Sequence, residues 1–460
     1  MDTELECLDL PPTIPNTSRE DSDLTLIGCS LSPEPVALVK TKNRPNQYRL
    51  PERQQLQNNL LTGVGFLELA NALDFAANVW NSIPIPRFVV ALMAAGGSVT
   101  VLMSLVAVRD AQLSWSNLRQ LWDERKYLDR LKRQHARNKD LVRYLDRRLG
   151  VNFREIGSEV VDRVGMDVFL GIGGIIVGIG TLLAIGGANP TIFHASNLLS
   201  GYIGNALAAV YGLVNAVWSA YLWVRFRRYA SAVAKNPDLA PFRQRVQLRF
   251  RRFRWHGFIT AMTGLVAGAA SMITATMWWG YIVLIPCIVS SVFCNVYWRA
   301  KLGYDRQIMT TLRSTRPQSL TEELAYVVSV QQALVNQNLP ESIMNGKNRK
   351  NNHNNNNNNN NESIAMIIQF IVDNNMFDQF CEWLFRRNQD LAPKFASEAG
   401  QDRIFITPDS LVKVCTETAP QVYDQAKQFL YKHGRKHFEY RERYLLELLG
   451  YDSWRQQAGL

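Results

Sequence analysis

Long runs without a charged residue constrain this chain more than any other feature. Residues 168–188 contain no Asp, Glu, Lys or Arg. Residues 257–298 form a block of 42 residues that also lacks all four of these residue types. A bilayer core about 30 Å thick is crossed by about 20 residues of helix. The first run therefore fits one membrane span. The second fits two spans joined near the aromatic residues at 277–281.

Six membrane spans are predicted, and short connections pair them into three hairpins. The predicted spans are 60–83, 88–108, 168–188, 197–224, 257–277 and 280–298. Basic residues crowd the long connections: residues 225–256 hold ten Lys or Arg against one acid, Asp238. By the positive-inside rule this side faces the cytosol. We therefore expect a multi-pass membrane protein with both termini in the cytosol.

The predicted fold class is all-α: a polytopic membrane helix bundle with a small helical cytosolic domain at the C-terminus. A capping box at Ser319–Glu322 opens one cytosolic helix, and the asparagine tract that follows cannot bury apolar surface. The predicted regions are a disordered cytosolic tail (1–59), the membrane domain (60–317) with cytosolic amphipathic linkers (109–164 and 225–256), a cytosolic helix (318–344), an Asn-rich disordered linker (345–361) and a helical cytosolic domain (362–460).

The glycine-rich stretch 169–187 predicts close helix packing and not a phosphate-binding loop. Its G-x-G-x-x-G pattern fails at Ile176, and no lysine supplies a Walker motif. On a helix, Gly171, Gly174 and Gly178 share one face, while Gly173 and Gly180 lie on the opposite face. Small residues also repeat every fourth position in the next span, which favours close approach of a neighbouring helix. These residues are Gly204, Ala208, Gly212 and Ala216.

The first predicted span carries polar residues on one arc. Glu68, Asn71, Asp74 and Asn78 fall on the same side of a helix at 100° per residue. Carboxylates inside a membrane are costly and normally face a bundle interior or water. We interpret the four residues as an ion or proton path. Two alternatives remain open: an amphipathic helix at the membrane interface, or a polar seam that only holds helices together.

The basic and aromatic stretch 241–255 predicts contact with lipid. The net charge of +11 would favour nucleic acid in a soluble protein, but here the charge lies beside apolar runs. An interfacial helix on anionic lipid at the cytosolic face is the simpler interpretation, so no nucleic acid is expected. The predicted headgroup contacts are Arg243, Arg245, Arg249, Arg251, Arg252 and Arg254.

Three functions follow from these patterns, in order of preference. The first is a membrane scaffold or regulatory protein whose cytosolic helices bind lipid, or a protein partner through the C-terminal helical domain. The second is a small-solute or ion transporter or channel that uses the intramembrane carboxylates. The third is a membrane enzyme, although the sequence holds no HExxH or GxSxG motif. Six scattered cysteines show no metal-ligand spacing, so neither a metal nor a cofactor is expected.

One segment carries a family resemblance. The run NSIPIPRFVVALMAAGGSVTVLMSLVAVRDAQLSWSNLRQLWDERKYL (81–128), followed by the glycine-rich span, resembles multi-pass integral membrane proteins of filamentous fungi. The similarity extends over the membrane region, 60–310. The resemblance implies a membrane bundle, and that group brings no activity and no functional residue to this chain.

Overall fold

The computed structural model describes most of the chain. The described residues are 35–41, 44–50, 55–57, 66–80, 84–309, 319–340, 356–388, 403–414 and 419–459, with 343 and 395. They are almost entirely helical, as the fold class requires.

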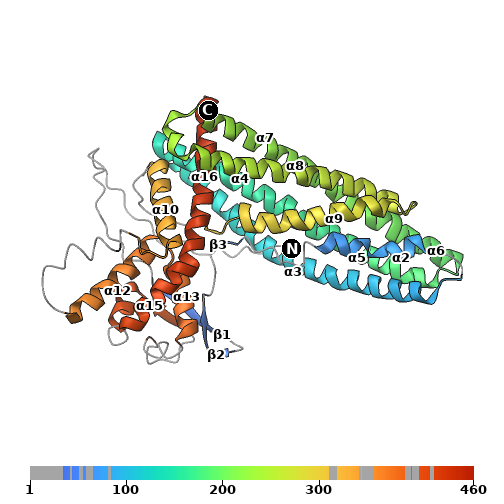
Figure 1. Cartoon of the computed structure of the whole chain (residues 1–460), viewed down its shortest axis with the longest axis horizontal. Coiled ribbons are helices and arrows are strands. Elements are labelled where there is room, and N and C mark those ends of the chain that lie inside the picture. The colour runs from blue at the N-terminus through green and yellow to red at the C-terminus, as the bar shows by residue number, and fades with distance from the viewer. Residues whose placement is uncertain are drawn as a thin grey trace, which may run out of the picture.

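Five long helical stretches form the body of the molecule and run side by side (Figure 1). Among the described residues these are the stretches long and apolar enough to cross a membrane. They comprise α3 (Arg87–Gln134); α4 (Lys139–Ser158), η3 (Glu159–Gly165), α5 (Met166–Leu183) and η4 (Ala184–Gly186); α6 (Pro190–Ser196), η5 (Asn197–Gly204) and α7 (Asn205–Lys235); η6 (Pro237–Phe242) and α8 (Arg243–Thr274); and α9 (Gly280–Tyr297) with η7 (Trp298–Leu302).

The outer surface of these helices is apolar. Leu102, Val217 and Phe293 are 61%, 65% and 65% exposed, and many other large apolar side chains also face outward. Water penalises so much exposed apolar surface, whereas lipid does not. The bundle is therefore compatible with a multi-pass membrane protein.

The glycines of α5 lie where neighbouring helices approach most closely. A Cβ atom on Gly178 would lie 2.7 Å from Val101 of α3, and one on Gly171 would lie 3.0 Å from the Ala107 side chain. Gly174 faces Ser104 in the same way. The glycines on the opposite face of α5 face η5, where a Cβ atom on Gly180 would approach Ser200. Helix α5 is thus sandwiched between α3 and η5.

Small residues also set the contact between α7 and α8. A Cβ on Gly264 would lie 3.0 Å from the backbone of Gly212, so the two helices meet backbone to backbone. Gly173 and Gly204 form a similar approach between α5 and η5. In α7, Ala216 is buried and Ala208 is partly buried.

Of the first predicted span, 60–83, the structure describes residues 66–80, and residues 60–65 and 81–83 lie outside the described residues. Its described helix is short and broken: α1 (Leu67–Asn71), a 3₁₀ turn η2 (Ala72–Asp74) and α2 (Phe75–Val79). These 13 residues reach about 20 Å at 1.5 Å each, less than the bilayer core. The segment still forms the predicted hairpin with α3, since the Thr100 hydroxyl donates to the Ala70 carbonyl at 2.6 Å. Among the residues that the structure describes, five helical stretches therefore meet the length of a span.

The predicted disordered tail, 1–59, contains strands in its described part. Strand β1 (Val36–Thr41) lies between β2 (Arg44–Arg49) and β5 (Arg403–Ile406) in an antiparallel sheet. Strand β3 (Gln55–Leu56) pairs with β4 (Arg306–Gln307). Alternation explains β1, because Val36 and Leu38 turn inward against the helices. Residues 1–34 lie outside the described residues.

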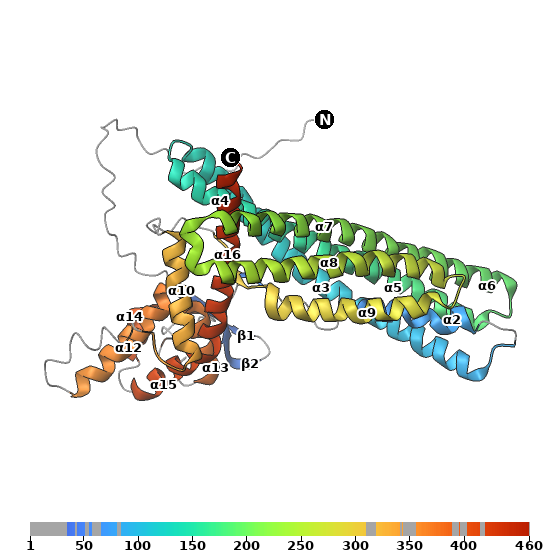
Figure 2. The ribbon, with the colours of Figure 1, turned by 45° about the horizontal axis from the view of Figure 1, so that its top comes forward.

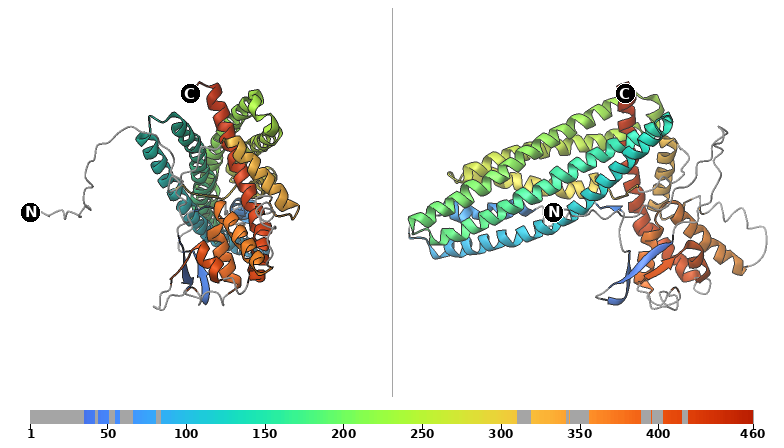
Figure 3. Two further views of the ribbon diagram at one scale, coloured as in Figure 1. Left: turned by 90° about the vertical axis from the view of Figure 1, so that its left-hand side faces the viewer. Right: turned by 180° about the vertical axis from the view of Figure 1, so that it is seen from behind.

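The C-terminal helices are α10 (Leu320–Val335), α12 (Asn356–Asp373), α13 (Phe377–Arg387), α14 (Pro408–Val414), α15 (Ala419–Phe429), η9 (Leu430–Gly434) and α16 (Arg435–Gln457). Helix α16 crosses the end of the long bundle, as two further views show (Figures 2 and 3).

The C-terminal helices share a hydrophobic core with the long helices. One hydrophobic core joins Phe226 of α7 and Phe250 of α8 to Phe438 and Leu445 of α16. Of the predicted linker 345–361, residues 345–355 lie outside the described residues, and 356–361 form the start of α12. The membrane bundle and the C-terminal helices are therefore packed as one body.

Candidate ion site within the helix bundle

Two neighbouring cavities lie among the long helices. The larger has a volume of about 100 Å³, the smaller about 30 Å³, and both are lined by Glu68, Tyr211, Asn215 and Gly264. Three helices thus meet where the cavities adjoin, because Glu68 comes from α1, Tyr211 and Asn215 come from α7, and Gly264 comes from α8. Closely packed interiors hold few such spaces, and those lined by polar groups are suited to water or ions.

Glu68 places a carboxylate on the wall of both cavities. Ser291 of α9 supplies a hydrogen bond to it. Its Oε2 atom is buried and accepts no hydrogen bond from the described residues. Asn215 on the same wall is also buried, and its Oδ1 atom likewise accepts no hydrogen bond from the described residues. The site therefore presents two oxygen acceptors without donors, which suits a proton or a cation.

Asp74 sits at the break in the first helical segment and is buried. Tyr281 donates its hydroxyl proton to Asp74 Oδ1 at 2.7 Å, and Asn78 Nδ2 donates to Oδ2 at 2.8 Å. Asn205 of α7 adds a further hydrogen bond. A 3₁₀ turn in the middle of a helix often marks a functional position. Asp74 is thus held at a kink that opens onto the smaller cavity.

The structure brings the four predicted path residues together. Glu68, Asn71 and Asp74 line the smaller cavity, and Asn78 is bonded to Asp74. Asn71 donates to the Leu170 carbonyl at 3.5 Å. The polar arc of this segment therefore points into the bundle, as expected for an intramembrane site and unlike a helix lying at the interface.

A second buried group of charges borders the larger cavity, and the sequence did not single it out. Arg163 lies 3.4 Å from Asp110 and 3.2 Å from Glu159. Asp167 faces Asp110. Glu159 and Arg163 belong to η3 and line the cavity, so a π-helical turn carries this wall. Such turns occur frequently at functional sites. Asp167 shares a helix face with Gly171, Gly174 and Gly178. This shared face is the sequence feature that could have identified Asp167 as part of a helix contact.

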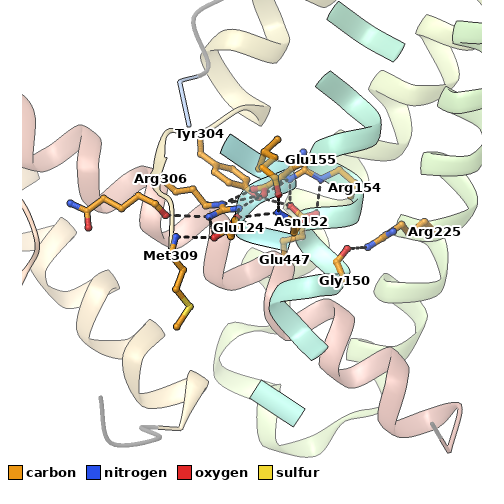
Figure 4. A network of polar contacts seen from close by, with 12 residues as sticks. Glu124, Gly150, Asn152, Arg154, Glu155, Arg225, Tyr304, Arg306, Met309 and Glu447 are labelled. Carbon is orange, nitrogen blue, oxygen red and sulfur yellow. Dashed lines mark hydrogen bonds and ion pairs between the residues drawn. The ribbon is translucent and has the colours of Figure 1, made fainter. Parts of the chain in front are cut away.

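A third network joins one end of the bundle to α16 (Figure 4). Arg154 donates two hydrogen bonds to Glu447, both 2.8 Å, and a third to Tyr304 at 2.6 Å. Burial alone would raise the pKa of Glu447, but Arg154, together with the charges of Arg249 and Arg225, outweighs burial and holds the pKa of that carboxyl below its ordinary value. Bidentate geometry makes this a strong pair.

The same network extends to the strand pair beside α3. Arg306 of β4 binds Glu124 of α3 at 2.6 Å and Glu155 of α4 (Figure 4). Arg154 and Glu155 also line the larger cavity. The junction between bundle and C-terminal helices is therefore built into the cavity wall. Pairs separated by about 300 residues leave no local sequence signal, so this network could not be foreseen.

The predicted lipid-binding arginines are partly corrected. Residues 243–254 continue straight into the apolar part of α8, so they do not form a separate interfacial helix. Arg249 is only 5% exposed and lies 4.8 Å over the Phe253 ring. Arg245 pairs with Glu442 of α16 at 2.8 Å. Helix α16 covers this face, and so removes Arg249 from lipid. Of the others, Arg251 is exposed, and three are half-buried: Arg243, Arg252 and Arg254.

No group of three or more His, Cys, Asp or Glu side chains in the described part of the chain is arranged to hold a metal ion. The chain matches no known protein family, no curated protein and no solved structure. The fold therefore defines its class only as a helical bundle compatible with a multi-pass membrane protein.

Proposed function

We propose that the protein is an ion transporter or channel whose path runs past Glu68 and Asp74. One observation carries this proposal: two cavities lined in part by buried carboxylates lie inside a bundle that exposes many large apolar side chains. Ionisable residues at membrane depth are expensive, and they mark ion pathways and proton relays. A packing seam would not need a carboxylate oxygen without a donor at a cavity wall.

The size of the cavities favours an ion over an organic solute. A dry apolar cavity of about 150 Å³ can hold benzene. The larger cavity here has about 100 Å³, and ionisable side chains form part of its wall. Protons and small monovalent cations fit this volume, and one carboxylate balances one positive charge.

The broken helical segment gives further support. In many transporters the ion site lies at a discontinuous helix near the middle of the membrane. The break at η2 places Asp74 next to the smaller cavity and is stabilised by Tyr281 and Asn78. Irregular backbone is tolerated at this depth because it is enclosed by other helices.

A membrane scaffold or regulatory protein is the second candidate. The observation that favours it is the shared core between α16 and the ends of α7 and α8 that pack against it. Such packing would transmit a protein contact on the C-terminal helices to the bundle. Lipid recognition by residues 243–254 receives less support, because Arg249 is buried.

Flux measurements on the purified full chain in proteoliposomes test the proposal. A double variant, Glu68→Gln with Asp74→Asn, removes both carboxylates and keeps the side-chain shapes. The matched control is Asp129→Asn on the exposed part of α3. We expect proton or monovalent-cation flux in the parent and control, and background flux in the double variant. Equal flux in all three, with the double variant monodisperse, would refute the path.

A further inference from the structure

Helices α3 and α5 bring two aspartates face to face. The helices run antiparallel, with Gly97 opposite Gly178 and Ala107 opposite Gly171. One more turn in the same register places Asp110 opposite Asp167. The two carboxyl groups lie close enough to interact directly. The glycines therefore bring α3 and α5 close together next to Asp110 and Asp167, which we call the acid pair.

The acid pair is enclosed. Asp110 is 0% exposed and Asp167 is 4% exposed. Neither carboxylate oxygen of Asp167 receives a hydrogen bond from an N–H or hydroxyl donor of the described residues. Two carboxyl groups can hydrogen-bond to each other only when a proton lies between them.

The surrounding charges point the same way. Arg163 faces the pair from η3 and also binds Glu159. Tyr211 on α7 interacts with Asp167 and also with Asp162 on η3 and Glu68 on α1, and none of these side chains carries a positive charge. Adjacent carboxylates in a low dielectric do not both ionise.

We infer that Asp110 and Asp167 share one proton and form a proton-binding site behind the wall of the larger cavity. Arg163 and Glu159 separate the pair from the cavity and line it. When the proton leaves, the pair gains one negative charge and attracts Arg163 away from Glu159. This inference rests on the proposed function, because it specifies the proton as the ion that the protein transports.

Infrared spectroscopy of the purified full chain tests the site without measuring flux. A protonated carboxyl group gives a C=O stretching band, distinct from carboxylate, that shifts in D₂O. Asp167→Asn and Asp110→Asn should each remove one carboxyl equivalent of this band, because the remaining aspartate then ionises beside Arg163. The double variant should remove no more than either single variant. Asp129→Asn should leave the band intact.

The outcomes separate the inference from the proposed function. Asp167→Glu, which keeps an acid at this position, should retain the band and guards against loss through misfolding. An unchanged band in both single variants, or loss of two equivalents in the double variant, would overturn the shared proton. Loss of the band as expected, together with no flux in the parent protein, would overturn transport and leave the proton site standing.

Discussion

The ion pair between Arg154 and Glu447 gives the sharpest stability prediction. Glu447 of α16 is 0% exposed, and both its oxygens accept hydrogen bonds from Arg154 of α4 at 2.8 Å. Tyr304 adds a hydrogen bond at 3.1 Å. Glu447→Gln keeps the shape and removes the charge. Arg154 then remains buried with its nearest carboxylate, Glu155, at 4.0 Å.

Breaking a buried pair by removing one partner typically costs 3–5 kcal/mol, so we expect Glu447→Gln to lower the free energy of unfolding by about 3 kcal/mol. The amide group introduced at position 447 can still accept one hydrogen bond from Arg154. The expected loss therefore lies at the low end of this range of free energies. Replacing both partners, with Arg154→Met and Glu447→Leu, should cost less than the single change, since no charge is left unpaired.

Reversible unfolding of the purified chain in mixed micelles, with a rising fraction of denaturing detergent, measures these differences. The control is Glu323→Gln, which breaks the half-exposed pair between Glu323 and Arg441 at 2.9 Å. Exposed pairs are worth about 0–1 kcal/mol, so the control should change little. If Glu447→Gln cost no more than the control, the pair would not hold α16 to the bundle.

Three further outcomes follow from single positions. Gly178→Leu should abolish the folded, monodisperse protein in size-exclusion chromatography, because its Cβ would lie 2.9 Å from the Gly97 carbonyl oxygen, whereas the exposed neighbour Ile179→Ala should be tolerated. Arg249→Ala should destabilise the protein by at least about 1 kcal/mol and Arg251→Ala by less than about 0.5 kcal/mol; equal effects would contradict the burial of Arg249. Burial lowers the pKa of His437 to about 4, below its ordinary 6.5, so the folded state keeps it neutral. The free energy of unfolding is therefore unaffected by His437 above pH 6.5 and falls as the pH drops toward 4, with a loss of about 2 kcal/mol at pH 5. His437→Gln should flatten this pH dependence in unfolding curves.

The features that sequence could predict are those that one segment determines alone. Uncharged length sufficed for the helices around 88–108 and 168–188, because a bilayer requires about 20 apolar residues wherever they occur. The inward turn of Glu68 and Asp74 followed from helical periodicity in the same way. The glycine spacing of α5 indicated two thin faces before any neighbour was known.

The features that escaped prediction depend on distant segments. Strand β1 exists because Leu38 and Ile404 are paired across the sheet, and neither segment reveals the other. Arg249 has the spacing of a lipid-facing arginine, but its surroundings are set by α16, almost 200 residues later. Asp167 is an intermediate case. Its place on the glycine face of α5 was visible, whereas its partner Asp110 required the register between α3 and α5.

The most direct test of the central claim is proton uptake by liposomes that contain the purified full chain. A potassium diffusion potential, negative inside, supplies the driving force, and an entrapped pH-sensitive dye reports acidification. The account predicts uptake well above that of empty liposomes, and a fall to the empty-liposome rate for Glu68→Gln, with Asp129→Asn unaffected. Uptake by Glu68→Gln at the parent rate, or no flux of protons or monovalent cations by the parent protein, would contradict it.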